Sequence, residues 1–169
     1  ETAIRNIFDK WGCVLVKPRY GAFGVGICKL ENADRLIDLI DFSQIGTVYV
    51  EKFYENSMKD WCGVNVVGGE ILYGYGKRES KIKDYKVFDR NQKGGEMILR
   101  KPNPEQEKIA LAVAKATGMD FFGVDIIKSK DDKYLVIDMN TFPGIYPDMM
   151  EPKKIAIQFK IAIKKRFGH

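Results

Sequence analysis

Two aspartates on neighbouring apolar segments give the strongest indication of chemistry in this sequence. Asp125 and Asp138 each interrupt an otherwise apolar run that is typical of a β-strand. If the turn between the runs centres on residues 131–132, the runs pair as a hairpin in which Asp125 lies directly opposite Asp138. Asn140 lies two residues beyond Asp138 and therefore points to the same face of its strand.

Carboxylates placed directly opposite each other repel, and their charged forms are costly when they leave water. A bound cation removes that cost. Ligands that are all oxygen atoms suit Mg²⁺ or Ca²⁺, and Mg²⁺ keeps coordination positions for water and phosphate oxygens. The alternative is a register slip of one residue, which would turn one of the aspartates to solvent and leave no metal site.

A glycine-rich loop follows the first predicted strand. Lys17 ends that strand, and Gly21, Gly24 and Gly26 follow it before a second strand. Glycines let the backbone approach a polyphosphate and direct its amides towards it. The loop is not a P-loop because Gly-Lys-Ser/Thr is absent, and a strand instead of a helix follows, unlike the dinucleotide fingerprint. An ordinary exposed hairpin that is rich in glycine remains the alternative interpretation.

The rare residues exclude several classes of site. The single histidine is the last residue, His169, which excludes histidine-based catalytic triads and histidine-rich zinc sites. Cys13, Cys28 and Cys62 form no Cys-x-x-Cys pair and are odd in number, which argues against zinc and against a disulfide framework. We expect buried thiols in a reducing compartment, the cytoplasm. Chemistry must then rest on carboxylates, lysines, arginines and backbone amides.

Length and charge set wider limits. The 169 residues are 45% hydrophobic and 30% charged, as expected of an ordinary globular domain. No apolar run approaches the roughly 20 residues that span a bilayer, so we expect no membrane partner. The net charge of +5, with many lysines after residue 152, favours an anionic partner such as a nucleotide or nucleic acid. A solvated helix face explains the same lysines without any partner.

The predicted elements that position these residues alternate between paired strands and single helices. This pattern predicts an α+β protein with mainly antiparallel sheets. The polar stretch 79–95 shows no clear periodicity and predicts a functional loop. We expect helices at 1–10, 33–42, 104–117 and from about 152, and strands at 13–17, 25–30, 47–53, 121–128 and 134–140, with a hairpin over 64–73.

The motifs occur in an order that resembles the ATP-grasp enzymes, specifically the glutamate-ligase branch. They are Lys17-Pro18 with the glycine loop, Val50-Glu-Lys-Phe-Tyr54, Gly123-Val-Asp125 and Asp138-Met-Asn-Thr-Phe-Pro-Gly144. The resemblance implies the ATP-grasp fold, two α+β subdomains with mainly antiparallel sheets, here with the N-terminal portion absent because the chain opens at Glu1. We expect residues 1–48 to be part of the first subdomain, with the phosphate loop, and 49–169 to be the second, with the metal site.

The resemblance also implies roles for matching positions. The ATP phosphates would meet Lys17 and the loop at Gly21, Gly24 and Gly26. The backbone of Glu51, Lys52, Phe53 and Tyr54 would meet adenine, and Asp60 would lie near the ribose. Arg78 would reach the transferred phosphate, and Arg90 would belong to a loop over the acceptor. The ligands of Mg²⁺, or of Mn²⁺ in its place, would be Asp125, Asp138 and Asn140.

The implied activity is that of an ATP-dependent carboxylate–amine ligase working through an acyl phosphate. Its partners would be ATP, a small-molecule or peptide carboxylate, and glutamate or a similar amino acid, with homo-oligomerisation left open. A nucleotide-binding module without catalysis is an alternative, because Cys62 stands where relatives carry arginine. A basic nucleic-acid-binding domain that uses the C-terminal lysines ranks below both, because no nucleic-acid motif accompanies the charge.

Overall fold

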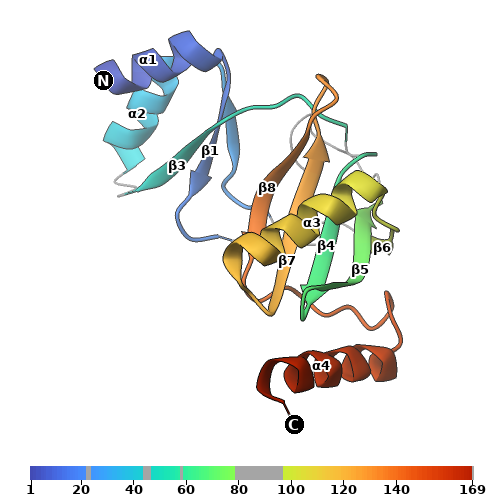
Figure 1. The fold of residues 1–169 in the computed structure, drawn as a ribbon. Helices are drawn as coiled ribbons and strands as arrows, with labels where there is room; N and C mark the ends of the chain where they lie inside the picture. The colour runs from blue at the N-terminus through green and yellow to red at the C-terminus, as the bar shows by residue number, and fades with distance from the viewer. Residues whose placement is uncertain (22–23, 44–46, 58, 79–96, 169) are drawn as a thin grey trace. The chain divides into compact units, whose positions relative to one another are not determined.

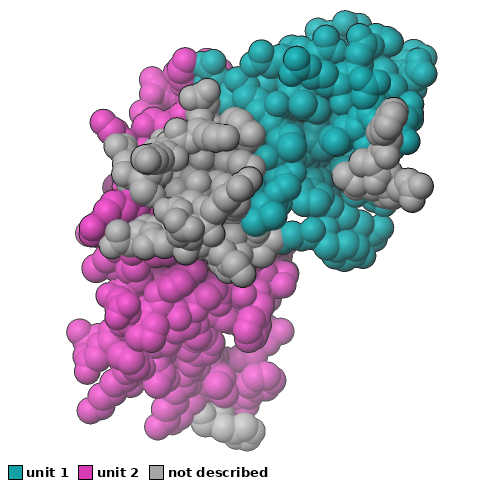
Figure 2. Space-filling model, turned by 180° about the vertical axis from the view of Figure 1, so that it is seen from behind, with its two compact units in different colours: residues 1–55, 80–95 teal, residues 56–79, 96–169 magenta. Residues whose placement is uncertain are grey.

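The structure is a computed structural model that describes residues 1–21, 24–43, 47–57, 59–78 and 97–168. The chain forms two compact units, coloured separately in Figure 2. Unit 1 contains residues 1–55, and unit 2 contains the described residues from 56 onward. The sequence placed the division after residue 48. The structure places it after Glu55, because the strand Val48–Lys52 is hydrogen-bonded into the sheet of unit 1.

Unit 1 is a small antiparallel sheet with two helices. Its strands lie in the order β2-β1-β3, and the helices α1 and α2 pack against the sheet through a shared apolar cluster (Figure 1). Val14 and Val16 of β1 are buried with Phe8 and Leu36. The opposite face of the sheet is therefore not used for the core. The bounds are α1 Thr2–Trp11, β1 Val14–Pro18, β2 Cys28–Leu30, α2 Ala33–Ser43 and β3 Val48–Lys52.

Unit 2 is built on an antiparallel sheet whose strands lie in the order β6-β5-β4-β7-β8. The predicted α+β class with mainly antiparallel sheets is confirmed in both units. The predicted strands 121–128 and 134–140 have the bounds of β7 and β8. The elements are β4 Cys62–Val67, β5 Glu70–Lys77, β6 Met97–Leu99, α3 Pro104–Thr117, β7 Phe121–Lys128, β8 Tyr134–Asn140 and α4 Pro152–Phe167.

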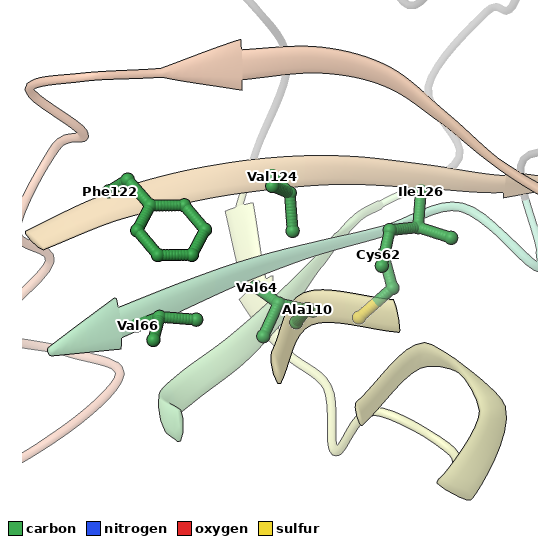
Figure 3. Packing of buried hydrophobic residues seen from close by; sticks show 7 residues of the cluster. All are labelled: Cys62, Val64, Val66, Ala110, Phe122, Val124 and Ile126. Atoms are coloured by element: carbon green, nitrogen blue, oxygen red, sulfur yellow. The ribbon is translucent and has the colours of Figure 1, made fainter. Parts of the chain in front are cut away.

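Helix α3 covers one face of this sheet. The helix begins with a capping box between Asn103 and Gln106 and ends at Gly118 in the left-handed conformation. Figure 3 shows the apolar side chains that alternate along β4 and β7 and pack against Ala110. Cys62 is fully buried there, which confirms the expectation for this thiol, and burial raises its pKa to about 11. Cys13 and Cys28 are only half-buried.

The other face of the sheet packs against the segment before α4 and against α4 itself. Tyr73, Tyr75 and Trp61 are buried in this second cluster together with Ile155 of α4. Three other isoleucines of α4 are exposed, namely Ile157, Ile161 and Ile163, so the apolar residues of this helix do not form one buried stripe. In the described ranges, the chain contains no helix with the length and hydrophobicity required for crossing a membrane.

Candidate functional site

The two aspartates face each other as the sequence predicted. Asp125 of β7 pairs directly with Asp138 of β8. The pairing is interrupted immediately beyond Asp125, where Ile126 pairs with Val136 and Ile137 is left as a bulge. Because this irregularity lies between the carboxylates and the turn, the pair itself keeps its register.

The neighbouring strands extend this pair into two rows across the sheet. In the first row, Tyr75, Gly63, Asp125 and Asp138 are successive partners on β5, β4, β7 and β8. In the second row, the corresponding residues are Tyr73, Asn65, Gly123 and Asn140. Directly paired residues share a face of a sheet, and so do residues two apart on one strand. Both carboxylates and the Asn140 amide therefore project from the face opposite α3.

The donor set on this face fits a hard divalent cation. Asp125 is half-buried, whereas Asp138 and Asn140 are exposed. Asp138 Oδ1 accepts a hydrogen bond from its neighbour Met139 N–H at 2.9 Å. The described ranges contain no cluster of three or more His, Cys, Asp or Glu side chains that could hold a metal, and the register places the amide of Asn140 beside the two carboxylates as a further oxygen donor. Two carboxylates and an amide oxygen suit Mg²⁺, which keeps several of its waters.

Lys77 is a residue of this face that the sequence did not single out. It lies on β5, two residues beyond Tyr75, and therefore on the side of the carboxylates. Partial burial lowers the pKa of its ammonium group, and the negative charges of Asp125 and Asp138 act in the opposite direction. The predicted cation, Arg78, follows the last residue of β5 and is exposed.

The aromatic side chain of Trp61 supports Lys77. The Lys77 Nζ lies 4.4 Å from the centroid of the Trp61 ring, which is itself 3% exposed. A cation held over an indole face is attracted by the ring quadrupole, more strongly where water is excluded. The indole also packs edge-on against Tyr75, with ring centroids 5.6 Å apart. The lysine thus extends from a rigid aromatic cluster, which limits the positions that its ammonium group can reach.

The open face of the unit 1 sheet brings together two other predicted residues. Lys17 Nζ lies 2.6 Å from Glu51 Oε2, joining β1 to β3. Lys29 of β2 occupies the same face, because Leu15 pairs with both Lys29 and Glu51. The side chains of Val48 and Val50 pack with the helix cluster on the opposite face. The face with Lys17 is therefore charged, and Lys29 is a cation there that the sequence did not single out.

The glycine loop begins and ends against Pro18. Gly24 and Gly26 have φ of 71° and 80°, a conformation that favours glycine. A side chain at Gly26 would also collide with the Pro18 ring, whose Cγ lies 3.0 Å from the position of the missing Cβ. A side chain at Gly21 would lie 3.2 Å from the same Cγ. The middle of the loop, at 22–23, lies outside the described residues.

The remaining predicted residues are more dispersed. The Phe53 N–H donates to Cys13 O at 3.1 Å, and its ring lies 4.8 Å from Lys29 Nζ, on the charged face. Lys52 pairs with Val14 and therefore faces the other way, with its Nζ 5.1 Å from the Tyr54 ring. Two further predicted residues remain: Asp60 is exposed in the turn before β4 of unit 2, and Arg90 lies outside the described residues.

The turn that contains Asp60 is held by Arg100 and is followed by the buried residue Cys62. The Cys62 side chain points into the core beneath α3, where an arginine would have no access to water. Arg100, which follows β6, donates from Nη1 to the carbonyls of Lys59 and Trp61 at 2.7 and 2.6 Å. A guanidinium from the segment after β6 therefore fixes this turn. Its planar group also lies over Gly76, where a Cβ would collide with it.

Known proteins share both the sequence and the fold of this chain. The α-aminoadipate–LysW ligase LysX of Saccharolobus solfataricus is 27% identical over 77% of the chain and 48% of that protein. A probable alpha-L-glutamate ligase of Histophilus somni is 26% identical over 98% of the chain and 55% of that protein. The crystal structure of D-cycloserine synthetase DcsG shares the fold, with a TM-score of 0.72 at 14% identity over 98% of the chain and 60% of that chain.

The extent of these matches sets what they establish. The chain spans about half the length of the curated relatives it matches. A family described as RimK-like ATP-grasp domain matches residues 3–165, which is nearly the whole chain. The predicted resemblance is confirmed at this level, and the chain belongs to the family of RimK-like ATP-grasp domains.

Proposed function

We propose that this chain supplies the nucleotide and metal sites of an ATP-dependent ligase that joins a carboxylate to an amine. The observation that carries the proposal is the Asp125–Asp138 pair with Asn140 in the adjacent row of the same face. Membership of the ATP-grasp family supports it, as do relatives whose names describe amino-acid ligases. We place the protein in the cytoplasm, in keeping with its free thiols.

Different residues would contact the different parts of ATP. Asp125, Asp138 and Asn140 would hold Mg²⁺, or Mn²⁺ in its place, which when bound offsets the negative charge of the phosphates. Lys17 and the glycine loop would contact the phosphates, and Lys29 adds positive charge to the same face of unit 1. The other contacts to ATP fall to the backbone of 51–54 at the adenine edge and to Asp60 near the ribose.

The proposed reaction has two steps. An oxygen of the acceptor carboxylate attacks the γ-phosphorus of ATP, and the bond to the bridging oxygen breaks, releasing ADP and an acyl phosphate. The amine of glutamate or a similar amino acid then attacks the acyl carbon, loses a proton and displaces phosphate to leave an amide. Lys77, on the carboxylate face, would stabilise the charge of the transferred phosphate, and Arg90 would contact the acceptor.

Substituting Lys77 separates its role from that of Arg78. A Lys77→Met change is expected to weaken binding of Mg²⁺–AMPPNP by about ten- to a hundredfold, because a charge-assisted hydrogen bond to phosphate contributes about 1.5–3 kcal/mol. Binding of ADP, which lacks the γ-phosphate, is expected to change much less. Isothermal titration calorimetry with both nucleotides measures the difference. Arg78→Met is the matched variant, and a larger loss of AMPPNP affinity there would return the role to Arg78.

Trapping the acyl phosphate tests the proposed reaction. The protein is incubated with ATP, Mg²⁺ and hydroxylamine, together with glutamate, α-aminoadipate or peptides that end in glutamate. Hydroxylamine converts an acyl phosphate into a hydroxamate, so equal amounts of ADP and hydroxamate are expected with an accepted carboxylate. ATP binding without ADP release across this panel would instead favour the module without catalysis.

A further inference from the structure

The segment that follows the metal-ligand candidates is tied to the sheet by a closed set of hydrogen bonds. Asn65 Nδ2 donates to Gly144 O and to Tyr73 Oη, at 3.0 Å each. Tyr73 Oη also donates to Gly144 O at 3.2 Å and accepts from the Tyr146 N–H at 3.0 Å. Two side chains of the central strands thus hold backbone groups that lie only four and six residues beyond Asn140.

Packing against Gly123 reinforces this connection. The position of a Cβ at Gly123 lies 2.9 Å from Pro143 Cβ and 2.9 Å from Asn65 Oδ1. Pro143 therefore packs directly on the backbone of β7, in the row that contains Asn65, Gly123 and Asn140. The Gly-Val-Asp motif and the Pro-Gly motif, far apart in sequence, meet at this contact.

An asparagine at position 65 is energetically unfavourable, because its polar side chain is buried in an apolar strand. Its side chain is fully buried in the central strand β4, and its Oδ1 accepts no hydrogen bond from any residue that the structure describes. A buried polar atom without a partner destabilises a fold, and an apolar residue of similar shape would avoid the penalty. Neighbouring Val64 and Val66 show that the strand is otherwise apolar. The two hydrogen bonds that Asn65 donates from Nδ2, to Gly144 O and to Tyr73 Oη, offset this penalty.

We infer that Asn65 and Tyr73 are positioning residues for the metal site. They fix the backbone at 143–146, and through it the end of β8 that carries Asp138 and Asn140. Both of these side chains are exposed on an edge strand, where packing alone holds them weakly. The inference rests on the proposed function, because it takes Asp125, Asp138 and Asn140 as the metal ligands.

Two substitutions test this role in the 169-residue chain. Tyr73→Phe removes only the hydroxyl, and Mn²⁺ binding in the presence of ADP is expected to weaken about tenfold, at the lower end of what outer-shell changes cost. Exchange of the Tyr146 amide, which loses its acceptor, is expected to accelerate. Asn65→Val is expected to weaken Mn²⁺ binding as well, while its melting temperature stays equal to or above that of the parent. If Asn65 had a purely structural role, the Asn65→Val change would lower both the Mn²⁺ affinity and the melting temperature.

Tyr134→Phe is the matched control. Tyr134 is on β8, but its hydroxyl accepts from Asn103 Nδ2 at 2.8 Å, at the start of α3. It is expected to keep the parent's Mn²⁺ affinity and Tyr146 exchange rate. Unchanged Mn²⁺ affinity in both Tyr73→Phe and Asn65→Val would overturn the inference alone. A parent chain that binds no Mn²⁺ with ADP would overturn the proposed metal site and, with it, this role.

Discussion

Replacing Asp138 with alanine is expected to abolish the thermal stabilisation that Mg²⁺ and ATP give the chain. A ligand present at a hundredfold excess over its Kd stabilises the native state by about 2.7 kcal/mol. Without the Asp138 carboxylate, the remaining proposed ligands are Asp125 and an amide, and we expect that contribution to vanish. The measurement is the melting temperature with and without Mg²⁺–ATP.

Without Mg²⁺ and ATP, the Asp138→Ala variant is not expected to be less stable than the parent chain. Asp138 is directly opposite Asp125, and its removal relieves a like-charge pair, which is worth roughly 0.2–1 kcal/mol in a sheet. The ligand-free melting temperature is therefore expected to stay the same or rise. Asp131→Ala, an exposed carboxylate in the turn of the same hairpin, is the matched control and should keep the full shift. An equal Mg²⁺–ATP shift in Asp138→Ala would remove Asp138 from the site.

Gly123→Ala is expected to damage both stability and metal binding. The added methyl group would lie within 3 Å of Pro143 and of Asn65, and Asn65 cannot withdraw without breaking its hydrogen bond to Gly144. Overpacking of this kind typically costs about 1–3 kcal/mol. Because Asn140 is the direct partner of Gly123, the displaced segment should also weaken Mg²⁺ binding. Urea unfolding and Mg²⁺–ATP melting shifts measure the two effects.

A glycine elsewhere in unit 2 separates the two effects. Gly118 ends α3 with a φ of 66°, and a Cβ there would meet no atom within 4 Å. Gly118→Ala should therefore lose stability through backbone strain alone, by about 1 kcal/mol, while its Mg²⁺–ATP shift is retained. If Gly123→Ala kept the parent's shift after a comparable loss of stability, Pro143 packing would have no connection with the metal site.

The register of the carboxylate hairpin shows how far sequence reasoning reached. A turn centred on residues 131–132 predicts Asp125 opposite Asp138, and this pairing is confirmed. The pairs nearest the turn, such as Lys128 with Tyr134, are offset by one residue from that expectation. The bulge at Ile137 restores the predicted register at the site. Apolar periodicity located both strands, but no local pattern announced the bulge.

The motif alone does not show which of two adjacent cations, Lys77 or Arg78, lies on the face of the sheet that carries the carboxylates. Lys77 and Arg78 are adjacent, so they point to opposite sides if the strand continues, and only the pairing of Tyr75 with Gly63 shows which side the carboxylates occupy. A second irregularity, between Asn65 and Val66, changes the alternation along this hairpin. The sequence therefore predicts cations at the end of this strand, but it does not predict which of them lies on the face with the carboxylates.

The contacts that position the site depend on long-range packing. Asn65 and Gly144 are 79 residues apart, and nothing in the local sequence around either indicates their hydrogen bond. Gly123 belongs to the Gly-Val-Asp motif, but the physical reason for a glycine there, the Pro143 ring packed against it, is a contact made only in the fold. The stretch 79–95, with Arg90, remains a sequence prediction because residues 79–96 lie outside the described ranges.

The most direct test of the metal site is to identify the atoms that bind the metal. Mn²⁺–ADP is bound to the chain labelled with ¹³C at the aspartate side-chain carboxyl carbons, and electron–nuclear double resonance measures the ¹³C couplings to Mn²⁺. We predict strong couplings from directly coordinated carboxylates, and their loss in an Asp125→Asn, Asp138→Asn double variant. Tightly bound Mn²⁺ without such couplings, or with couplings that persist in the double variant, would contradict the assignment of Asp125 and Asp138 as ligands.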